Sequence, residues 1–199
     1  MVEKPLNYSE RQARQYEIFQ QWVRDEGGQE WPTQLTTLLA EHQRARMDWL
    51  RCHVIGSVLE VGCNFGLVLA WVGGHYGVDI HPVNIELARL LAPDRLFQVA
   101  GAADLPFADK DFDTVMLPEV LEHLEFPDGV YAAIQEAKRV ARVRVLFTCP
   151  DGRKDTTDAC SMKHRWLFDD SIAREILTWL PGVVLKYEHG FALGRWDKR

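Results

Sequence analysis

The sequence predicts an α/β protein: a Rossmann-like, doubly wound and mostly parallel sheet of about seven strands, with an N-terminal helical cap. From residue 56 onward, short apolar runs alternate with stretches of helical periodicity. That alternation implies parallel strands joined by right-handed crossovers, with helices on both faces. A length of 199 residues suits one domain with a full core and is short for two. We expect a single domain, with the cap over 1–55 and the core over 56–199.

The cap is expected to contain two helical stretches separated by a break. Apolar residues recur at helical spacing on two faces, formed by Tyr16, Phe19, Trp22 and Val23 and by Leu35, Leu38, Leu39, His42 and Trp49. The segment GGQEWP between the two faces provides the break.

The core is expected to begin with five strands, because five apolar runs of strand length follow the cap. They are SVLEV (57–61), HYGVDI (75–80), RLFQVA (95–100), FDTVML (112–117) and VRVLFTC (143–149). Helical candidates alternate with them at 65–72, 83–92, 128–141 and 169–179. After Pro181-Gly182, VVLKYEHG and FALGRW predict a closing hairpin. Ligands of open α/β sheets bind at the carboxyl ends of the strands, beside the switch in strand order, so we expect the site there.

The overall composition narrows the class of protein. A net charge of −6 argues against a nucleic-acid partner, because phosphate binding usually needs a basic face. The four cysteines show no CxxC spacing, and no run approaches the roughly 18 apolar residues of a membrane span. We therefore expect a cytoplasmic enzyme with reduced thiols and no membrane segment. The oligomeric state is not predicted.

A glycine turn follows the first predicted strand, in Glu60-Val61-Gly62-Cys63-Asn64-Phe65-Gly66. Gly62 and Gly66 remove Cβ atoms where a ligand would have to touch the backbone. Asn64 tolerates a left-handed backbone better than other residues that carry a side chain. Taken alone, this pattern also fits an ordinary strand-to-helix turn.

The second predicted strand ends in an acid, Asp79, nineteen residues after Glu60. An acidic side chain about 20 residues past a glycine turn is placed to bind a ribose diol. The alternative is that Asp79 only caps the helix that begins near Pro82. Ile80 could lie against an adenine ring. Because the charge of Glu60 would oppose a pyrophosphate but suit an ammonium or sulfonium ligand, the turn favours S-adenosylmethionine over NAD.

Four segments in this order, VLEVGCNFG, GVDIHPVNIELAR, AADLPFADKDFDTV and EVLEHLEFPDG, make the chain resemble a class I S-adenosylmethionine-dependent methyltransferase. The likeness covers residues 57 to about 180 and is greatest to the group whose third segment reads LPF followed by FD. It implies S-adenosylmethionine as cofactor.

The resemblance also implies a role for individual residues. Glu60, Gly62 and Gly66 would hold the methionine end of the cofactor, with Cys63, Asn64 and Phe65 lining the turn. The remaining contacts would be made by Asp79 to the ribose, Ile80 to the adenine face, Ala102 and Ala103 to the adenine edge, and Leu117 to the amino group. This chain reads Gly101-Ala102-Ala103 where the group usually has an acid for the adenine amine. Asp104, or a backbone contact, would take its place.

The segment PEVLEHLEFP, after the fourth predicted strand, places Glu119, Glu122 and His123 at i, i+3 and i+4. One helical turn would aim all three side chains the same way. Three interpretations stay open: His123 or Glu119 is a general base, the three side chains ligate a divalent metal, or they form a polar first turn with His123 packed in the core. The string E-x-x-E-H resembles the metal site of small-RNA 3′-terminal 2′-O-methyltransferases and of ubiquinone-biosynthesis O-methyltransferases. His164 would then be a further ligand, or a substrate-side catalytic residue.

The resemblance therefore implies methyl transfer to oxygen or nitrogen of a small-molecule acceptor. The acceptor site would come from the cap, the segment after the fourth strand and the loop at 150–168. One alternative is a metal-dependent methyltransferase of RNA 3′ ends, which would need a basic channel from Arg142, Arg144, Arg153, Lys154, Lys163 and Arg165. The other is a cofactor-binding subunit that catalyses nothing.

Overall fold

The structure, a computed structural model, describes residues 41–153 and 165–198. Most of the predicted cap and His164 lie outside this range. The elements are α3 (Glu41–His53), β1 (Val58–Val61), α4 (Leu67–Val72), β2 (Tyr76–Asp79), α5 (Pro82–Leu91), β3 (Leu96–Val99), β4 (Phe112–Pro118), η1 (Leu121–His123), α6 (Asp128–Val140), β5 (Ala141–Pro150), α7 (Asp170–Trp179), β6 (Val184–Glu188) and β7 (Phe191–Asp197). Among the described residues, no helix has the length and apolar character needed to cross a membrane.

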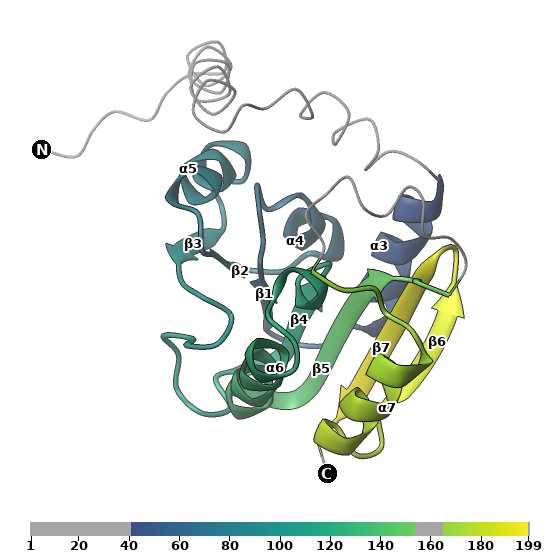
Figure 1. Cartoon of the computed structure of the whole chain (residues 1–199). Coiled ribbons are helices and arrows are strands. Elements are labelled where there is room, and N and C mark those ends of the chain that lie inside the picture. Colours follow the sequence, from purple (N-terminus) through teal and green to yellow (C-terminus); the bar gives the residue numbers. More distant parts are fainter. Residues whose placement is uncertain (1–40, 154–164, 199) are drawn as a thin grey trace, which may run out of the picture.

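The strands form one seven-stranded sheet in the order β3-β2-β1-β4-β5-β7-β6 (Figure 1). Strands β1 to β5 pair in parallel, whereas β7 pairs antiparallel with both β5 and β6. The predicted hairpin is therefore present. Its turn has a positive φ at His189 (53°) and at Gly190 (86°), as a two-residue turn between twisted strands requires. The predicted Rossmann-like fold is confirmed.

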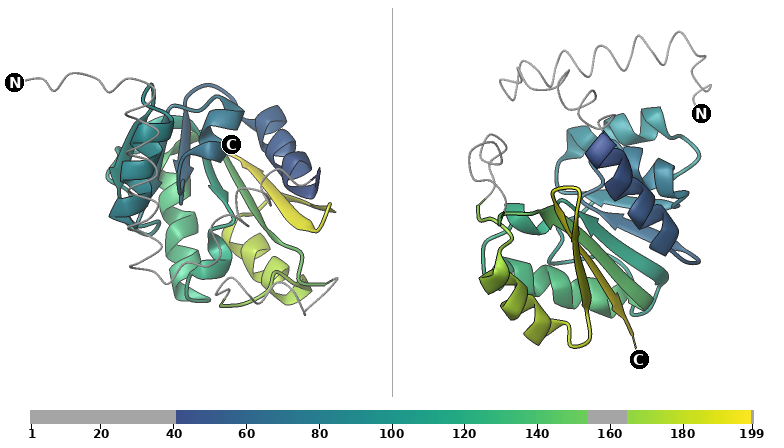
Figure 2. Two further views of the ribbon diagram at one scale, coloured as in Figure 1. Left: turned by 90° about the horizontal axis from the view of Figure 1, so that it is seen from above. Right: turned by 90° about the vertical axis from the view of Figure 1, so that its right-hand side faces the viewer.

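Helices cover both faces of the sheet (Figure 2). One apolar cluster includes Leu50 of α3, Leu69 of α4 and Ile85 of α5. The cluster on the opposite face includes Ile134 of α6 and Ile176 of α7. The central strands are buried on both sides, which explains why β4 and β5 read as continuous apolar runs and not as alternating ones.

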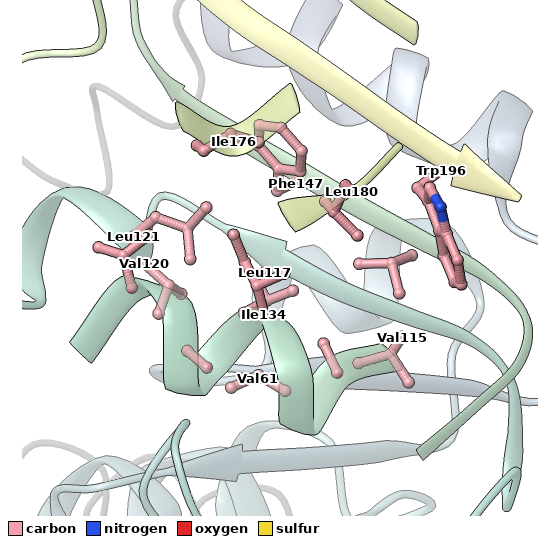
Figure 3. Packing of buried hydrophobic residues seen from close by; sticks show 14 of the residues in the cluster. Val61, Val115, Leu117, Val120, Leu121, Ile134, Phe147, Ile176, Leu180 and Trp196 are labelled. Carbon is pink, nitrogen blue, oxygen red and sulfur yellow. The ribbon is translucent and has the colours of Figure 1, made fainter. Parts of the chain in front are cut away.

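The period-two alternation of the strands decides which side chains meet each layer. Leu117 of β4 and Phe147 of β5 pack with Ile134 and Ile176 in the cluster of Figure 3, whereas Met116 belongs to the other cluster. In β1 the same alternation places Leu59 and Val61 on the α6 face; it turns Val58 and Glu60 toward α3 and α4.

Strand order reverses at β1, because β1 lies between β2 and β4 while β3 lies beyond β2. The carboxyl ends of β1, β2 and β4 therefore meet at the switch point, where ligands bind in sheets of this kind. These three strand ends carry Glu60, Asp79 and Glu119. The fold thus gathers candidate site residues that lie up to 59 positions apart in the sequence.

Candidate active site

The turn after β1 has a left-handed backbone at three positions, with φ of 71° at Gly62, 49° at Asn64 and 74° at Gly66. A Cβ atom added at Gly62 would lie 2.5 Å from the side chain of Val120, and one added at Gly66 would lie 2.7 Å from the ring of Phe97. Both glycines are thus required by backbone conformation and by packing. The contact with Val120 also places this turn directly against the segment after β4.

Two further residues of the turn point into the core. Cys63 and Phe65 are both buried, and Phe65 packs with Leu87 of α5. Burial raises the pKa of the Cys63 thiol far above its ordinary value, so it stays protonated and is a poor nucleophile. A Cβ atom at Gly77 would lie 2.8 Å from the Cys63 sulfur, so the space beside the thiol is full. Packing accounts for a small residue at this position.

Asp79, at the end of β2, is held against the glycine turn. One carboxylate oxygen accepts the backbone N–H of Asn64 at 2.9 Å. The other accepts the backbone N–H of His81 at 2.9 Å and the side-chain amide of Asn84 at 3.0 Å. The carboxylate, which can accept about four hydrogen bonds, therefore keeps some free acceptor capacity. The adjacent Ile80 is 66% exposed, and its apolar surface lies open beside this carboxylate.

Glu60 is buried in β1, and its Oε2 atom has no hydrogen-bond partner among the described residues. Burial raises the pKa of this carboxyl well above its ordinary value, and the Asp79 carboxylate adds to the rise. The Arg46 guanidinium and the backbone N–H of Leu69 act in the opposite direction. A buried acceptor without a donor is costly unless a ligand supplies one. An ammonium group would satisfy the Oε2 atom.

The loop after β3 is closed by a short bridge between Gly101 and Asp104. Ala103 and Asp104 are exposed and Ala102 is half-buried. The loop therefore presents two small side chains and one exposed carboxylate at the edge of the sheet. The following LPF segment is held by α6. Arg139 donates to the carbonyls of Leu105 at 2.9 Å and Phe107 at 2.7 Å.

The segment after β4 does not form the single helical turn that we expected. Leu117 is buried, but Glu119 has a left-handed backbone with φ of 55°, and only Leu121–His123 form a short 3₁₀ helix. Glu122 is 1% exposed, whereas the neighbouring His123 is exposed. The expectation that all three side chains point the same way is wrong, because the helical repeat begins after Glu119. The alternative of a core-packed His123 is also wrong.

Glu119 is half-buried and fixed to the end of β5 by two hydrogen bonds. Its backbone N–H donates to the Thr148 carbonyl at 2.9 Å. The Thr148 hydroxyl donates to Glu119 Oε1 at 3.0 Å. Burial raises the pKa of the Glu119 carboxyl, while Arg46 and the Thr148 hydroxyl oppose the rise. A carboxylate with a raised pKa is a stronger base than an exposed one.

Glu122 differs from Glu119 in that neither carboxyl oxygen makes a standard hydrogen bond to a described residue. Burial, and then the charge of Glu119, raise the pKa of Glu122 well above its ordinary value, so it favours the neutral acid. The Cys149 thiol lies beside it and is likewise kept protonated by burial. Within 41–153 and 165–198, no three His, Cys, Asp or Glu side chains are grouped so as to hold a metal ion.

Sequence reasoning missed Arg46 of α3 and Thr148 of β5. Arg46 is 4% exposed and donates to the Thr148 hydroxyl at 3.3 Å, so it connects α3 to the site. One signal was available, because Arg46 shares the buried helix face of Leu50, four residues on. A charged residue in an apolar helix stripe indicates a buried partner. His164 lies outside the described residues.

Residues 59–149 match a family described as "Methyltransferase domain". This part of the chain is a methyltransferase domain, and the match supports the class I S-adenosylmethionine-dependent type that the sequence predicted. The resemblance inferred from the four sequence segments is therefore confirmed. S-adenosylmethionine is the cofactor that this type of domain implies.

Curated relatives of this methyltransferase domain match part of the chain. The O-methyltransferase resE of Aspergillus sclerotiorum is 29% identical over 118 residues, 54% of this chain and 41% of its own length. The methyltransferase GfsG of Streptomyces halstedii is 32% identical over 115 residues, 52% of this chain and 39% of its own length. The chain thus spans about two fifths of the length of these relatives.

Solved structures match more of the chain but at low identity. A possible histamine N-methyltransferase from Thermotoga maritima has a TM-score of 0.70 at 16% identity, over 92% of this chain and all of its own. The magnesium protoporphyrin IX methyltransferase of Synechocystis, with bound S-adenosylhomocysteine, has a TM-score of 0.65 at 17% identity, over 92% and 100% of the two chains. The [4+2]-cyclase SpnF has a TM-score of 0.63 at 15% identity, over 77% and 80%. These likenesses show the fold, and the cyclase shows that the fold also carries other activities.

Proposed function

We propose that the protein is a methyltransferase that moves the methyl group of S-adenosylmethionine to oxygen or nitrogen of a small-molecule acceptor. The single observation that carries the proposal is the buried Glu60 oxygen, which has no donor in 41–153 and 165–198 and lies beside a glycine turn that Asp79 ties to the end of β2. The methyltransferase domain and the methyltransferase names of the relatives support it. A cytoplasmic location stays a prediction from the reduced thiols.

In this proposal the residues of the turn and of the neighbouring strand ends hold the cofactor. Glu60 accepts from its ammonium group, and the backbone of Gly62 to Gly66 borders its methionine end. Asp79 uses its remaining acceptor capacity for the ribose hydroxyls, and the exposed Ile80 covers one adenine face. Ala102, Ala103 and Asp104 border the adenine edge, and the backbone at Leu117 meets the amino group.

The cofactor supplies an electrophilic methyl group, so the protein's part is to align the acceptor and to receive its proton. Glu119 is the first candidate to receive the proton of the acceptor. Thr148 fixes its carboxylate at the end of β4, and burial makes this carboxylate a stronger base. His123, exposed one short turn later, is the second candidate. His164 stays a prediction.

Calorimetric titration with S-adenosylhomocysteine tests the cofactor site. Asp79→Ala should weaken binding about 10- to 100-fold, the range of a lost hydrogen bond to a charged group. Glu86→Ala, which removes an exposed acid from α5, is the control and should leave the affinity unchanged. Equal affinity of wild type and Asp79→Ala would overturn the ribose assignment. Failure of the wild type to bind would overturn the proposed function.

A further inference from the structure

We propose that Arg46 is a positioning residue of the cofactor site: from α3, outside the matched methyltransferase domain, it supplies the buried counter-charge that lets Glu60 hold a cationic ligand group. The inference rests on the proposed function. It assigns a role to a helix that precedes the matched residues 59–149.

The Arg46 guanidinium is fixed in place from several sides. Its Nε atom donates to the side chain of Gln43 at 2.9 Å, and an Nη atom donates to the Thr148 hydroxyl at 3.3 Å. The guanidinium carbon lies 5.4 Å from the centre of the Phe191 ring. With 4% of its surface exposed, Arg46 is more buried than arginine usually is. Its position is therefore set by the fold.

The hydrogen bonds of Thr148 have a fixed direction. Arginine can only donate, and an ionised carboxylate can only accept. Thr148 Oγ1 therefore accepts from Arg46 and gives its single proton to Glu119 at 3.0 Å. The guanidinium thus connects α3, the end of β5 and the end of β4. Leu50, one helical turn after Arg46, and Val58, two residues before Glu60, pack in one cluster, so Arg46 and Glu60 face the same side of the sheet.

The charges around Glu60 explain why a cation is needed there. The groups that act on its carboxyl are the Arg46 guanidinium from α3, the Asp79 carboxylate from β2 and the Leu69 N–H from α4. Glu60 in turn acts on the Cys63 thiol of the adjoining turn. Arg46 is the cationic side chain among these groups. The same guanidinium also acts on Glu119 and Glu122, so one positive charge opposes three carboxyl groups.

Removing Arg46 should therefore keep Glu60 protonated to a higher pH. A ligand ammonium needs the ionised carboxylate, so the loss of affinity should be larger at low pH than at high pH. Each pKa unit of the rise makes binding about tenfold weaker below the pKa. If Arg46 only contacted the ligand, its removal would lower the affinity by the same factor at every pH.

The test titrates S-adenosylhomocysteine and 5′-methylthioadenosine, which lacks the amino-acid end, at pH 6.5 and 8.5. We expect Arg46→Met to weaken S-adenosylhomocysteine binding about tenfold or more at pH 6.5 and clearly less at pH 8.5. Affinity for 5′-methylthioadenosine should stay within about twofold, below the threshold of a lost hydrogen bond. Arg46→Lys should restore much of the pH profile, since it keeps a buried charge.

The matched control is Arg44→Met, which removes the same charge from an exposed position of the same helix and should leave both affinities unchanged. An equal loss at both pH values, a parallel loss of 5′-methylthioadenosine binding, or no loss would overturn the inference. If Arg46→Met fails to fold, Arg46→Lys decides: a pH profile like that of wild type supports the inference, and a uniform loss at both pH values overturns it. Failure of the wild type to bind S-adenosylhomocysteine would instead overturn the proposed function.

Discussion

At the scale of single residues, the carboxyl groups of the site differ in how many hydrogen-bond donors the fold supplies to each. Within the described part of the chain, Asp79 has three donors and Glu119 has the Thr148 hydroxyl, whereas one oxygen of Glu60 has no donor. Unsatisfied buried acceptors cost stability and persist where a ligand uses them. Stability and ligand affinity should therefore change in opposite directions when the Glu60 charge is removed.

Glu60→Gln tests this opposition. The amide keeps the size of the side chain and removes the buried charge, so the free energy of unfolding of the ligand-free protein should rise by about 1 kcal/mol at pH 8. Affinity for S-adenosylhomocysteine should fall about tenfold or more. Urea denaturation and calorimetry measure the two quantities. Glu86→Gln, exposed on α5, is the control and should change neither.

The stabilising effect of Glu60→Gln should depend on pH. Because the folded-state pKa of Glu60 lies above its ordinary value, the folded chain binds the proton more tightly than the unfolded chain does. Glu60 therefore contributes stability below the ordinary pKa that is lost as the pH rises through the folded-state pKa. Wild type and Glu60→Gln should be closer in stability at pH 5 than at pH 8. A constant difference would contradict this.

At the scale of elements, the glycine turn depends on the segment after β4 as much as on its own strand. Gly62 and Gly73 have nearly the same φ, 71° and 77°, but different surroundings. A Cβ atom at Gly62 would lie 2.5 Å from Val120, whereas one at Gly73 would meet nothing within 4 Å. Comparing substitutions at Gly62 and Gly73 therefore separates the cost of backbone strain from the cost of a side-chain clash.

Gly73→Ala should cost about 1 kcal/mol of unfolding free energy, the price of a left-handed alanine. Gly62→Ala should cost about 2–4 kcal/mol, because the clash with Val120 adds to the same strain. Chemical denaturation measures both. Adding Val120→Ala to Gly62→Ala should recover part of the loss in a non-additive way. Equal costs for the two glycines would show that Val120 moves aside freely.

The elements also show what the sequence could and could not predict. The strands were readable because burial on both faces leaves apolar runs, as in β4 and β5. The prediction of one helical turn after β4 was wrong. The spacing of Glu119, Glu122 and His123 fits a helix, but the backbone at Glu119 is left-handed and the short 3₁₀ helix begins only at Leu121. The partner of Arg46 could not be predicted, because Thr148 is 102 positions away; the helix face that Arg46 shares with Leu50 indicated burial but not the partner.

At the scale of the whole molecule, the fold separates a supporting scaffold from a site at one edge of the sheet. The order of β5, β7 and β6 was not predicted, because antiparallel insertion of a hairpin strand depends on which sheet edge is open. Arg144 of β5 ties this region together, pairing with Asp197 of β7 and donating to the His53 carbonyl at the end of α3. The roles assigned to His164 and to the predicted cap over 1–55, of which 1–40 lie outside the described residues, stay predictions.

The charge distribution of the whole molecule bears on the RNA alternative. Three of the arginines that a basic channel would need are paired with aspartates: Arg142 with Asp113, Arg144 with Asp197, and Arg153 with Asp151. The net charge is −6. Since nucleic-acid binding draws on unpaired cations and counterion release, these three arginines offer little of the positive charge that an RNA would need.

We therefore expect no saturable binding of a 22-nucleotide RNA with a free 3′ hydroxyl, measured by fluorescence anisotropy at 50 mM salt with up to about 10 μM protein. Even non-specific nucleic-acid binders with a basic face bind in the range of about 1–100 μM and strengthen at low salt. In a separate titration, addition of a chelator should leave S-adenosylhomocysteine affinity unchanged. For the RNA measurement, the comparison variant is Arg142→Glu, which adds negative charge beside Asp113. Salt-dependent binding by the wild type that Arg142→Glu weakens would favour the RNA-end methyltransferase over a small-molecule enzyme.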